Sequence, residues 1–304
     1  NGGVTLTATS GNITVGSLTS SRAVTLNASV GNITQLTGTA ITTLSTVPGN
    51  STLSVRSAGD ATIGNSVTNP NNVIGSGYVT FNVTGGGNAT LVTKTNATTL
   101  LSSNVTGSLS LTSSNRNIVL GSGLGTSGLS VVVNGNLSVN AGTANISDND
   151  YSSFNVFGTV NLTGTTVTLD AAYKNGAISP SVRLGQINAT VTNRLELGET
   201  TTVNLGAINA GIAGLNVFQV PELLIQSTTG GVVDSGLIAA NNAVFAVSGN
   251  NSVVLADNGI VNTAIRGGID HNVSNVISSN FGTATVNAVT YATSSTGNIT
   301  VTAS

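Results

Sequence analysis

The acidic residues and the histidine are the side chains of this chain that could perform acid–base chemistry. Hydrolysis of a glycosidic bond needs two carboxyl groups that face one substrate, and histidine is the commonest general base. The candidates form three close groups: Asp148 with Asp150, Glu196 with Glu199, and Asp270 with His271, the only histidine. Aspartate is equally common at loop tips, and no nucleophile elbow or phosphate loop accompanies these groups. We therefore expect solvated turn residues, His271 included, and no enzyme.

The segment Asp148-Asn149-Asp150 also offers oxygen atoms of the kind that Ca²⁺ prefers as ligands. It lacks the glycine and the distal glutamate of a calcium loop, and the chain has no acidic nonapeptide repeat. No other spaced set of metal ligands occurs. We expect neither a metal site nor a cofactor.

Asparagine in Asn-x-Ser/Thr sequons can carry an N-linked glycan. The chain has fifteen such sequons, whereas its composition alone would give roughly ten. The alternative is that asparagine and threonine build turns and stacked side-chain ladders, and we favour this second interpretation. The asparagines that we keep as glycosylation candidates are Asn12, Asn27, Asn32, Asn82, Asn88, Asn96, Asn104 and Asn298.

A short repeated segment must position all these residues. It runs from Val4 to Val15 as Val-Thr-Leu-Thr-Ala-Thr-Ser-Gly-Asn-Ile-Thr-Val, and near copies occupy 24–34 and 289–301, with a looser copy at 110–121. Alternation places the apolar residues of each run on one face, and Gly-Asn suits a turn with positive φ. A period of about twenty residues is typical of solenoids, so each copy predicts one coil of a parallel β-solenoid.

The whole chain then predicts an all-β fold of roughly 15 coils of about 20 residues, rising ~4.8 Å per coil to give a rod of roughly 70 Å. We expect a single solenoid over 1–304, with regular coils over about 1–145 and 281–304 and a less regular middle over about 146–280. In this register the isoleucines that follow the Gly-Asn turns point into the core and stack from coil to coil: Ile13, Ile33 and Ile299.

Composition narrows the class of protein. Only 6% of the residues are charged and the net charge is −2, so nothing attracts nucleic acid or anionic lipid. No apolar run is long enough to span a membrane, and 39% hydrophobic residues argue for a packed core. The chain has no methionine and starts at Asn1, so we expect a processed chain or an internal piece. The absence of cysteine fits either export in an unfolded state or a core that needs no disulfide.

The repeated Val-Thr-Leu-x-Ala-x-x-Gly-Asn-Ile-Thr-Val coil resembles the shafts of filamentous haemagglutinin-type adhesins, which are exoproteins of two-partner secretion. The resemblance covers the regular ends better than the middle. It implies a right-handed parallel β-helix, export through an outer-membrane pore, and a role in adhesion or biofilm outside the cell or at the bacterial surface. Some members are N-glycosylated at sequons. The segment Asn69-Pro70-Asn71-Asn72 only half matches the secretion-domain motif of the family, so we do not assign that domain.

We therefore expect an extracellular structural or adhesive shaft, a segment or repeat unit of a surface fibre with a cell-surface or glycan ligand. The alternative is a carbohydrate-binding or polysaccharide-degrading β-helix, although four Tyr, six Phe and no Trp leave few platforms for sugar stacking. The chain also predicts head-to-tail self-association. If a second copy followed directly, the interval from Val289 to the next Val4 would nearly equal the interval from Val4 to Val24, so the coil rhythm would continue through the junction.

Overall fold

The computed structural model describes residues 2–47, 52–64, 71–94, 96–121, 130–149, 151–174, 181–211, 223–236, 238–247, 252–255, 271–279, 283–286 and 298–301. Side chains are described as far as Phe245, apart from those of residues 173, 174, 239 and 241–244. The chain forms two compact units, Asn1–Gly158 and Thr159–Ser304, which we call unit 1 and unit 2 and describe separately. No helix among the described residues is long and apolar enough to cross a membrane.

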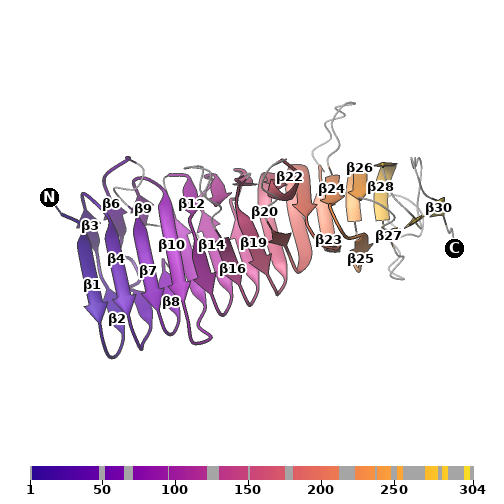
Figure 1. The fold of residues 1–304 in the computed structure, drawn as a ribbon. Coiled ribbons are helices and arrows are strands. Elements are labelled where there is room, and N and C mark those ends of the chain that lie inside the picture. The colour runs from indigo at the N-terminus through magenta and orange to yellow at the C-terminus, as the bar shows by residue number, and fades with distance from the viewer. Residues whose placement is uncertain are drawn as a thin grey trace. The chain divides into compact units, whose positions relative to one another are not determined.

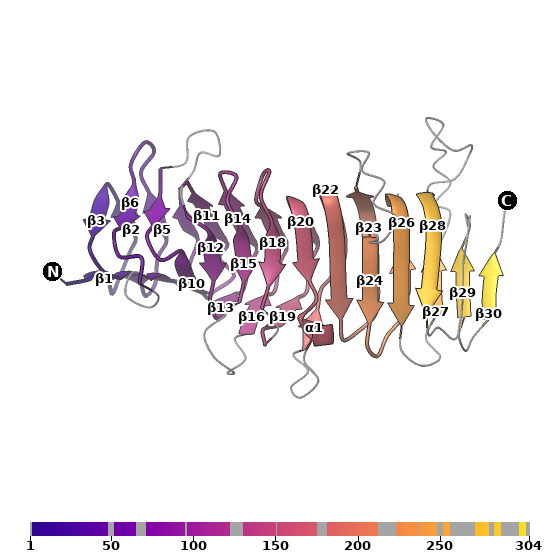
Figure 2. The same cartoon turned by 90° about the horizontal axis from the view of Figure 1, so that it is seen from above.

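Unit 1 consists of short parallel strands stacked in columns (Figures 1 and 2). Column A contains β1 (Val4–Ala8), β4 (Val24–Ala28), β7 (Leu53–Ser57), β10 (Tyr78–Val83), β13 (Ser103–Val105), β16 (Ser130–Val133) and β19 (Ser153–Val156). Column B contains β2 (Ile13–Val15), β5 (Ile33–Gln35), β8 (Ala61–Ile63), β11 (Ala89–Thr93), β14 (Leu109–Ser113) and β17 (Leu137–Asn140).

The third side of unit 1 changes along the stack. Its first part is a separate three-stranded sheet of β3 (Leu18–Ser20), β6 (Ile41–Thr43) and β9 (Val73–Ile74). Its second part is the stack of β12 (Thr98–Leu100), β15 (Ile118–Leu120) and β18 (Ile146–Asp148). Every described pairing is parallel, which confirms the predicted all-β parallel solenoid.

Most coils are longer than the sequence repeat predicts. Val4 pairs with Val24, as the repeat requires, but Val24 pairs with Leu53, which lies much further along the chain. Later steps of column A are also longer than the first, as in the pair of Val105 with Val133. The strands keep their length because the added residues lie in the loops between them, where extra length costs little free energy. Coils of this size leave room for fewer than the fifteen expected.

The core of unit 1 follows the predicted alternation. In β4 the residues Val24, Leu26 and Ala28 are fully buried, and Thr25 and Asn27 between them are half-buried. Ile13 and Ile33 are both buried and directly paired, which confirms their predicted stacking. The side chain of Ile299 lies outside the described residues.

Unit 2 combines short strands with five strands that are longer than any described in unit 1. It contains β20 (Val160–Leu169), α1 (Ala171–Lys174), β21 (Val182–Arg183), β22 (Gln186–Glu199), β23 (Val203–Ala210), β24 (Leu223–Ser227), β25 (Val232–Asp234), β26 (Ile238–Val247), β27 (Ser252–Leu255), β28 (His271–Ser279), β29 (Thr283–Val286) and β30 (Asn298–Val301). The five long strands are β20, β22, β23, β26 and β28. One parallel series is β20, β22, β24, β26 and β28, shown side by side in Figure 2, and another is β23, β25, β27, β29 and β30. A register shift between Gly164 and Thr166 interrupts the pairing of β20 with β22.

Candidate functional site

A continuous side-chain ladder runs along the corner between columns A and B of unit 1. At each rung a side-chain oxygen accepts a hydrogen bond from the backbone N–H of the rung residue in the next coil. The donor–acceptor distances are 2.8 Å from Asn32 to Asn12, 2.8 Å from Asp60 to Asn32, 2.8 Å from Asn88 to Asp60, 2.8 Å from Ser108 to Asn88, and 3.0 Å from Asn136 to Ser108. We call these six residues the corner ladder. Each rung needs only an acceptor oxygen, which Asn, Asp and Ser all supply.

Close packing against the neighbouring coil requires the glycine before every rung except the first, because a Cβ on Gly11 would meet no atom within 4 Å. A Cβ on Gly59 would collide with Asn32 Oδ1, and one on Gly87 would collide with the carbonyl oxygen of Gly59. Gly11 has a positive φ of 86°, but Gly31, Gly59 and Gly87 do not. The predicted positive-φ turn is therefore confirmed at Gly11 but wrong at Gly31, where the corner must admit the neighbouring coil instead.

The corner ladder also accounts for four of the sequons. After a rung such as Asn32, alternation along the strand buries the next residue, Ile33, and turns Thr34 outward. Asn12, Asn88 and Asn136 are followed by the same pair of one buried and one outward hydroxyl residue. The sequon pattern Asn-x-Ser/Thr at this corner therefore has a structural explanation: an acceptor Asn at the rung, a buried residue, and an outward hydroxyl residue. Glycosylation of Asn12, Asn32 and Asn88 remains a prediction.

Three other glycosylation candidates share one outward row of column A. In register order this row includes Asn27, Arg56, Asn82 and Asn104. Asn82 and Asn104 are exposed, whereas Asn27 is half-buried and its Oδ1 has no hydrogen-bond partner among the described residues. A glycan would therefore meet the least obstruction at Asn82 and Asn104.

Asn96 has a structural role. Its Nδ2 donates to the carbonyl oxygens of Ile74 at 3.2 Å and Gly75 at 2.9 Å, so it covers the edge of β9 where the three-stranded sheet ends. The folded chain thereby occupies the nitrogen that a glycan would use. Asn298 lies in β30, and its side chain is outside the described residues.

A buried amide pair, Gln35 with Asn72, was missed by sequence reasoning. The two amides exchange hydrogen bonds of 2.9 Å in both directions. Asn72 Oδ1 also accepts from the N–H of Ile41 at 2.8 Å, and its Nδ2 donates to the carbonyl oxygen of Val92 at 3.0 Å. Asn72 is 1% exposed, so it ties three coils together from inside rather than forming a surface turn.

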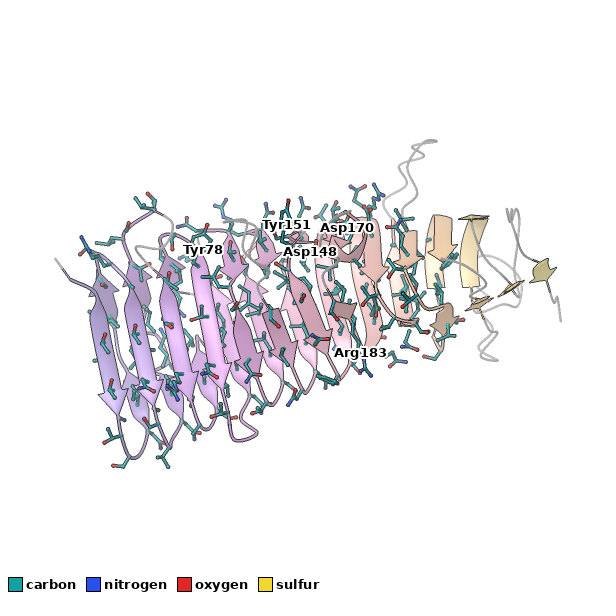
Figure 3. All side chains as sticks on the ribbon, in the orientation of Figure 1. Tyr78, Asp148, Tyr151, Asp170 and Arg183 are labelled. Atoms are coloured by element: carbon teal, nitrogen blue, oxygen red, sulfur yellow. The ribbon has the colours of Figure 1, made fainter. Side chains whose placement is uncertain are left out.

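The carboxyl groups proposed for acid–base chemistry do not converge. Glu196 lies on the outward face of β22, where its Oε2 is 3.1 Å from Nη2 of Arg194, while Glu199 is fully buried on the opposite face. Asp148, labelled in Figure 3, is half-buried at the end of β18. Asp150 lies outside the described residues.

The group of Asp270 and His271 also differs from expectation. Asp270 is outside the described residues, while the backbone of His271 pairs with Ile238 as the first residue of β28. The prediction of a loop position for His271 was therefore wrong, and its side chain is not described. Among the described residues no group of three or more His, Asp or Glu could hold a metal ion.

Glu199 is the unusual carboxyl of unit 2. Its Oε2 accepts from the N–H of Leu184 at 3.0 Å and from Thr201 Oγ1 at 3.4 Å, whereas Oε1 is buried without a partner among the described residues. Burial raises the pKa of Glu199 to about 8, and the two hydrogen bonds and the charge of Arg183 offset part of that effect. The group is therefore largely protonated at neutral pH. The sequence did contain a signal, since Leu195, Leu197 and Glu199 alternate on the inward face.

The corner ladder, the Gln35–Asn72 pair and Glu199 are thus the polar features that the described structure singles out. No family model matches the chain, and no curated protein or solved structure matches it either.

Proposed function

We propose that this chain is a structural and adhesive shaft, a segment of a larger adhesin or fibre outside the cell or at the bacterial surface. The observation that carries the proposal is the corner ladder. Five of its six side chains accept a hydrogen bond from the next coil along the stack, so they hold coils together rather than converging on a substrate.

The outward surface of column A suits contact with a polar ligand. Thr5, Thr25, Ser54 and Thr80 follow one another in register, and a hydrogen bond of 2.8 Å joins the hydroxyls of Ser54 and Thr80. Hydroxyl and amide groups can hydrogen-bond to sugars or to other polar surfaces without a charge requirement. This series of outward hydroxyl groups supports a cell-surface or glycan ligand for the shaft.

The resemblance of the repeated coil to filamentous haemagglutinin-type shafts supports the same proposal. In such a shaft, copies of this chain would join head to tail, because a coil that has corner glycines and acceptor side chains can stack on another of the same kind. Electron microscopy of the purified protein should then show rods with a distribution of lengths. Uniform single particles at high concentration would contradict the self-association but not the shaft.

Attachment and hydrolysis can be measured on the same preparation. Beads coated with the chain should retain host cells or polysaccharide, and Glu196→Gln should retain them equally well. An assay of new reducing ends on the same polysaccharides should show no release above that of uncoated beads. Release of sugar that Glu196→Gln abolishes would refute the proposal, as would the absence of attachment to any cell or polysaccharide in the panel.

A further inference from the structure

Glu199 joins two segments of unit 2 that are separated in the sequence. The carboxyl belongs to the end of β22. The N–H of Leu184 that donates to it belongs to the segment 181–185, in which Leu184 directly follows β21. The same segment is held by Thr200, whose N–H and Oγ1 both donate to the carbonyl oxygen of Val182, at 2.9 and 2.8 Å. Two neighbouring residues thus fasten one piece of chain, and only one of them can ionise.

The surroundings of Glu199 offer little to hold a negative charge. From β21 it faces Arg183, which is exposed, and from β24 it is paired with Ser227, whose hydroxyl donates to the carbonyl oxygen of Thr201. The segments β20 and β24 contain no ionisable residue. On β22 itself, Arg194 and Glu196 pair with each other on the outward face.

The remaining ionisable groups near this corner belong to the start and the end of α1. Asp170 precedes α1 and is buried. Because Leu169 pairs with Leu197, Asp170 lies beside the end of β22, and as an acidic group it cannot stabilise a negative charge on Glu199. The side chains of Tyr173 and Lys174 in α1 lie outside the described residues. An ionised Glu199 would therefore keep one oxygen in an apolar interior with no hydrogen bond, which is costly.

We propose that Glu199 is a proton-dependent latch that fastens the segment 181–185 while it is protonated and releases this segment as it loses its proton. Release lets the carboxyl reach water, where it gives up its proton to the solvent. This device goes beyond the shaft function and does not depend on it.

The direction of the pH effect follows from the two states of the latch. The pKa of Glu199 is about 8 when the latch is closed and near the ordinary value of 4.5 when it is open. Below pH 4.5 both states are protonated and the latch holds fully. Between the two values only the open state ionises, so the opening equilibrium rises about tenfold per pH unit. Above about pH 8 both states are ionised, and opening no longer depends on pH.

Hydrogen exchange of the whole chain tests the latch directly. After correction for the intrinsic pH dependence of exchange, the protection of the Leu184 amide should fall about 70-fold between pH 5 and pH 7 in the wild type. A peptide from unit 1 that covers Ile33 should keep constant protection and serves as the internal control. If the protection of the Leu184 amide in the wild type did not change between pH 5 and pH 7, that result alone would overturn the proposal.

Two variants separate ionisation from simple loosening. Glu199→Gln keeps an acceptor for Leu184 but cannot ionise in this range, so the protection of Leu184 should become independent of pH. Thr200→Val loses the hydroxyl bonds to Val182 and should lower the protection at every pH, while the wild-type slope remains. The same slope in Glu199→Gln as in the wild type, or loss of the slope in Thr200→Val, would assign the pH dependence to another group.

Discussion

Replacing Asn72 with leucine tests whether the buried amide pair holds the coils of unit 1 together. The substitution keeps a side chain of similar size but removes the two N–H donors of the amide and the oxygen that accepts two hydrogen bonds. Four groups then lose a partner in the interior: the N–H of Ile41, the carbonyl oxygen of Val92, and both ends of the Gln35 amide. The perturbation is large because Asn72 is 1% exposed and water cannot easily replace it.

The expected cost can be worked out from these groups. A buried group left without its hydrogen bond costs about 1 kcal/mol or more, so the four groups cost about 4 kcal/mol together. The added apolar surface of leucine recovers about 1 to 2 kcal/mol. Asn72→Leu should therefore lower the free energy of unfolding of unit 1 by about 2 to 3 kcal/mol.

Urea denaturation followed by circular dichroism measures the total loss, and hydrogen exchange at the Ile41 amide measures it locally. The matched control is the double variant Gln35→Leu with Asn72→Leu, in which no buried amide of Gln35 is left without its partner. It should be no less stable than Asn72→Leu alone, because the two residues act as a pair. A loss below about 0.5 kcal/mol in Asn72→Leu, or additive losses in the double variant, would refute the reasoning.

The other predictions concern the corner ladder and the core. Asn32→Ser keeps an acceptor oxygen for the N–H of Asp60, as Ser108 does for Asn136, and should be nearly neutral, whereas Asn32→Leu should cost about 1 kcal/mol in urea denaturation; equal losses would contradict the ladder. Ile13→Asp should cost on the order of 3 to 5 kcal/mol, because it buries an unpaired charge. Gly59→Ala should be destabilising in a thermal melt, since its Cβ would meet Asn32 Oδ1, while Gly16→Ala meets no atom within 4 Å and should melt like the wild type.

The sequence predicts those parts of this fold that depend on local pattern. The alternation around Ile13 and Ile33 is enough to place both residues in the core and to predict stacked parallel strands. The coil length is not predictable in the same way, because it depends on the loops. The residues between Val24 and Leu53 that make that coil longer have no periodic pattern to count.

Among the buried polar residues, too, only those that continue a local alternation can be predicted from the sequence. Asn72 follows Asn69-Pro70-Asn71, a segment with the composition of a surface turn, so only the return of the chain to Gln35 and Val92 reveals that it is buried. Glu199 could have been found, since it continues an inward alternation. Reading Glu196 and Glu199 as a pair was an error of spacing, because their positions in one strand differ by an odd number and therefore face opposite sides.

The way that each coil of unit 1 bonds only to its neighbours has a mechanical consequence. If the two ends of unit 1 were pulled apart, tension would peel strands from the stack one coil at a time instead of breaking all the pairings at once. In column A a short coil runs from Val4 to Val24, and a longer one runs from Val24 to Leu53. Each released coil would thus lengthen the chain by about 70 to 100 Å, since an extended chain spans about 3.5 Å per residue. Such a tether would yield stepwise under load and recover its length as coils re-form.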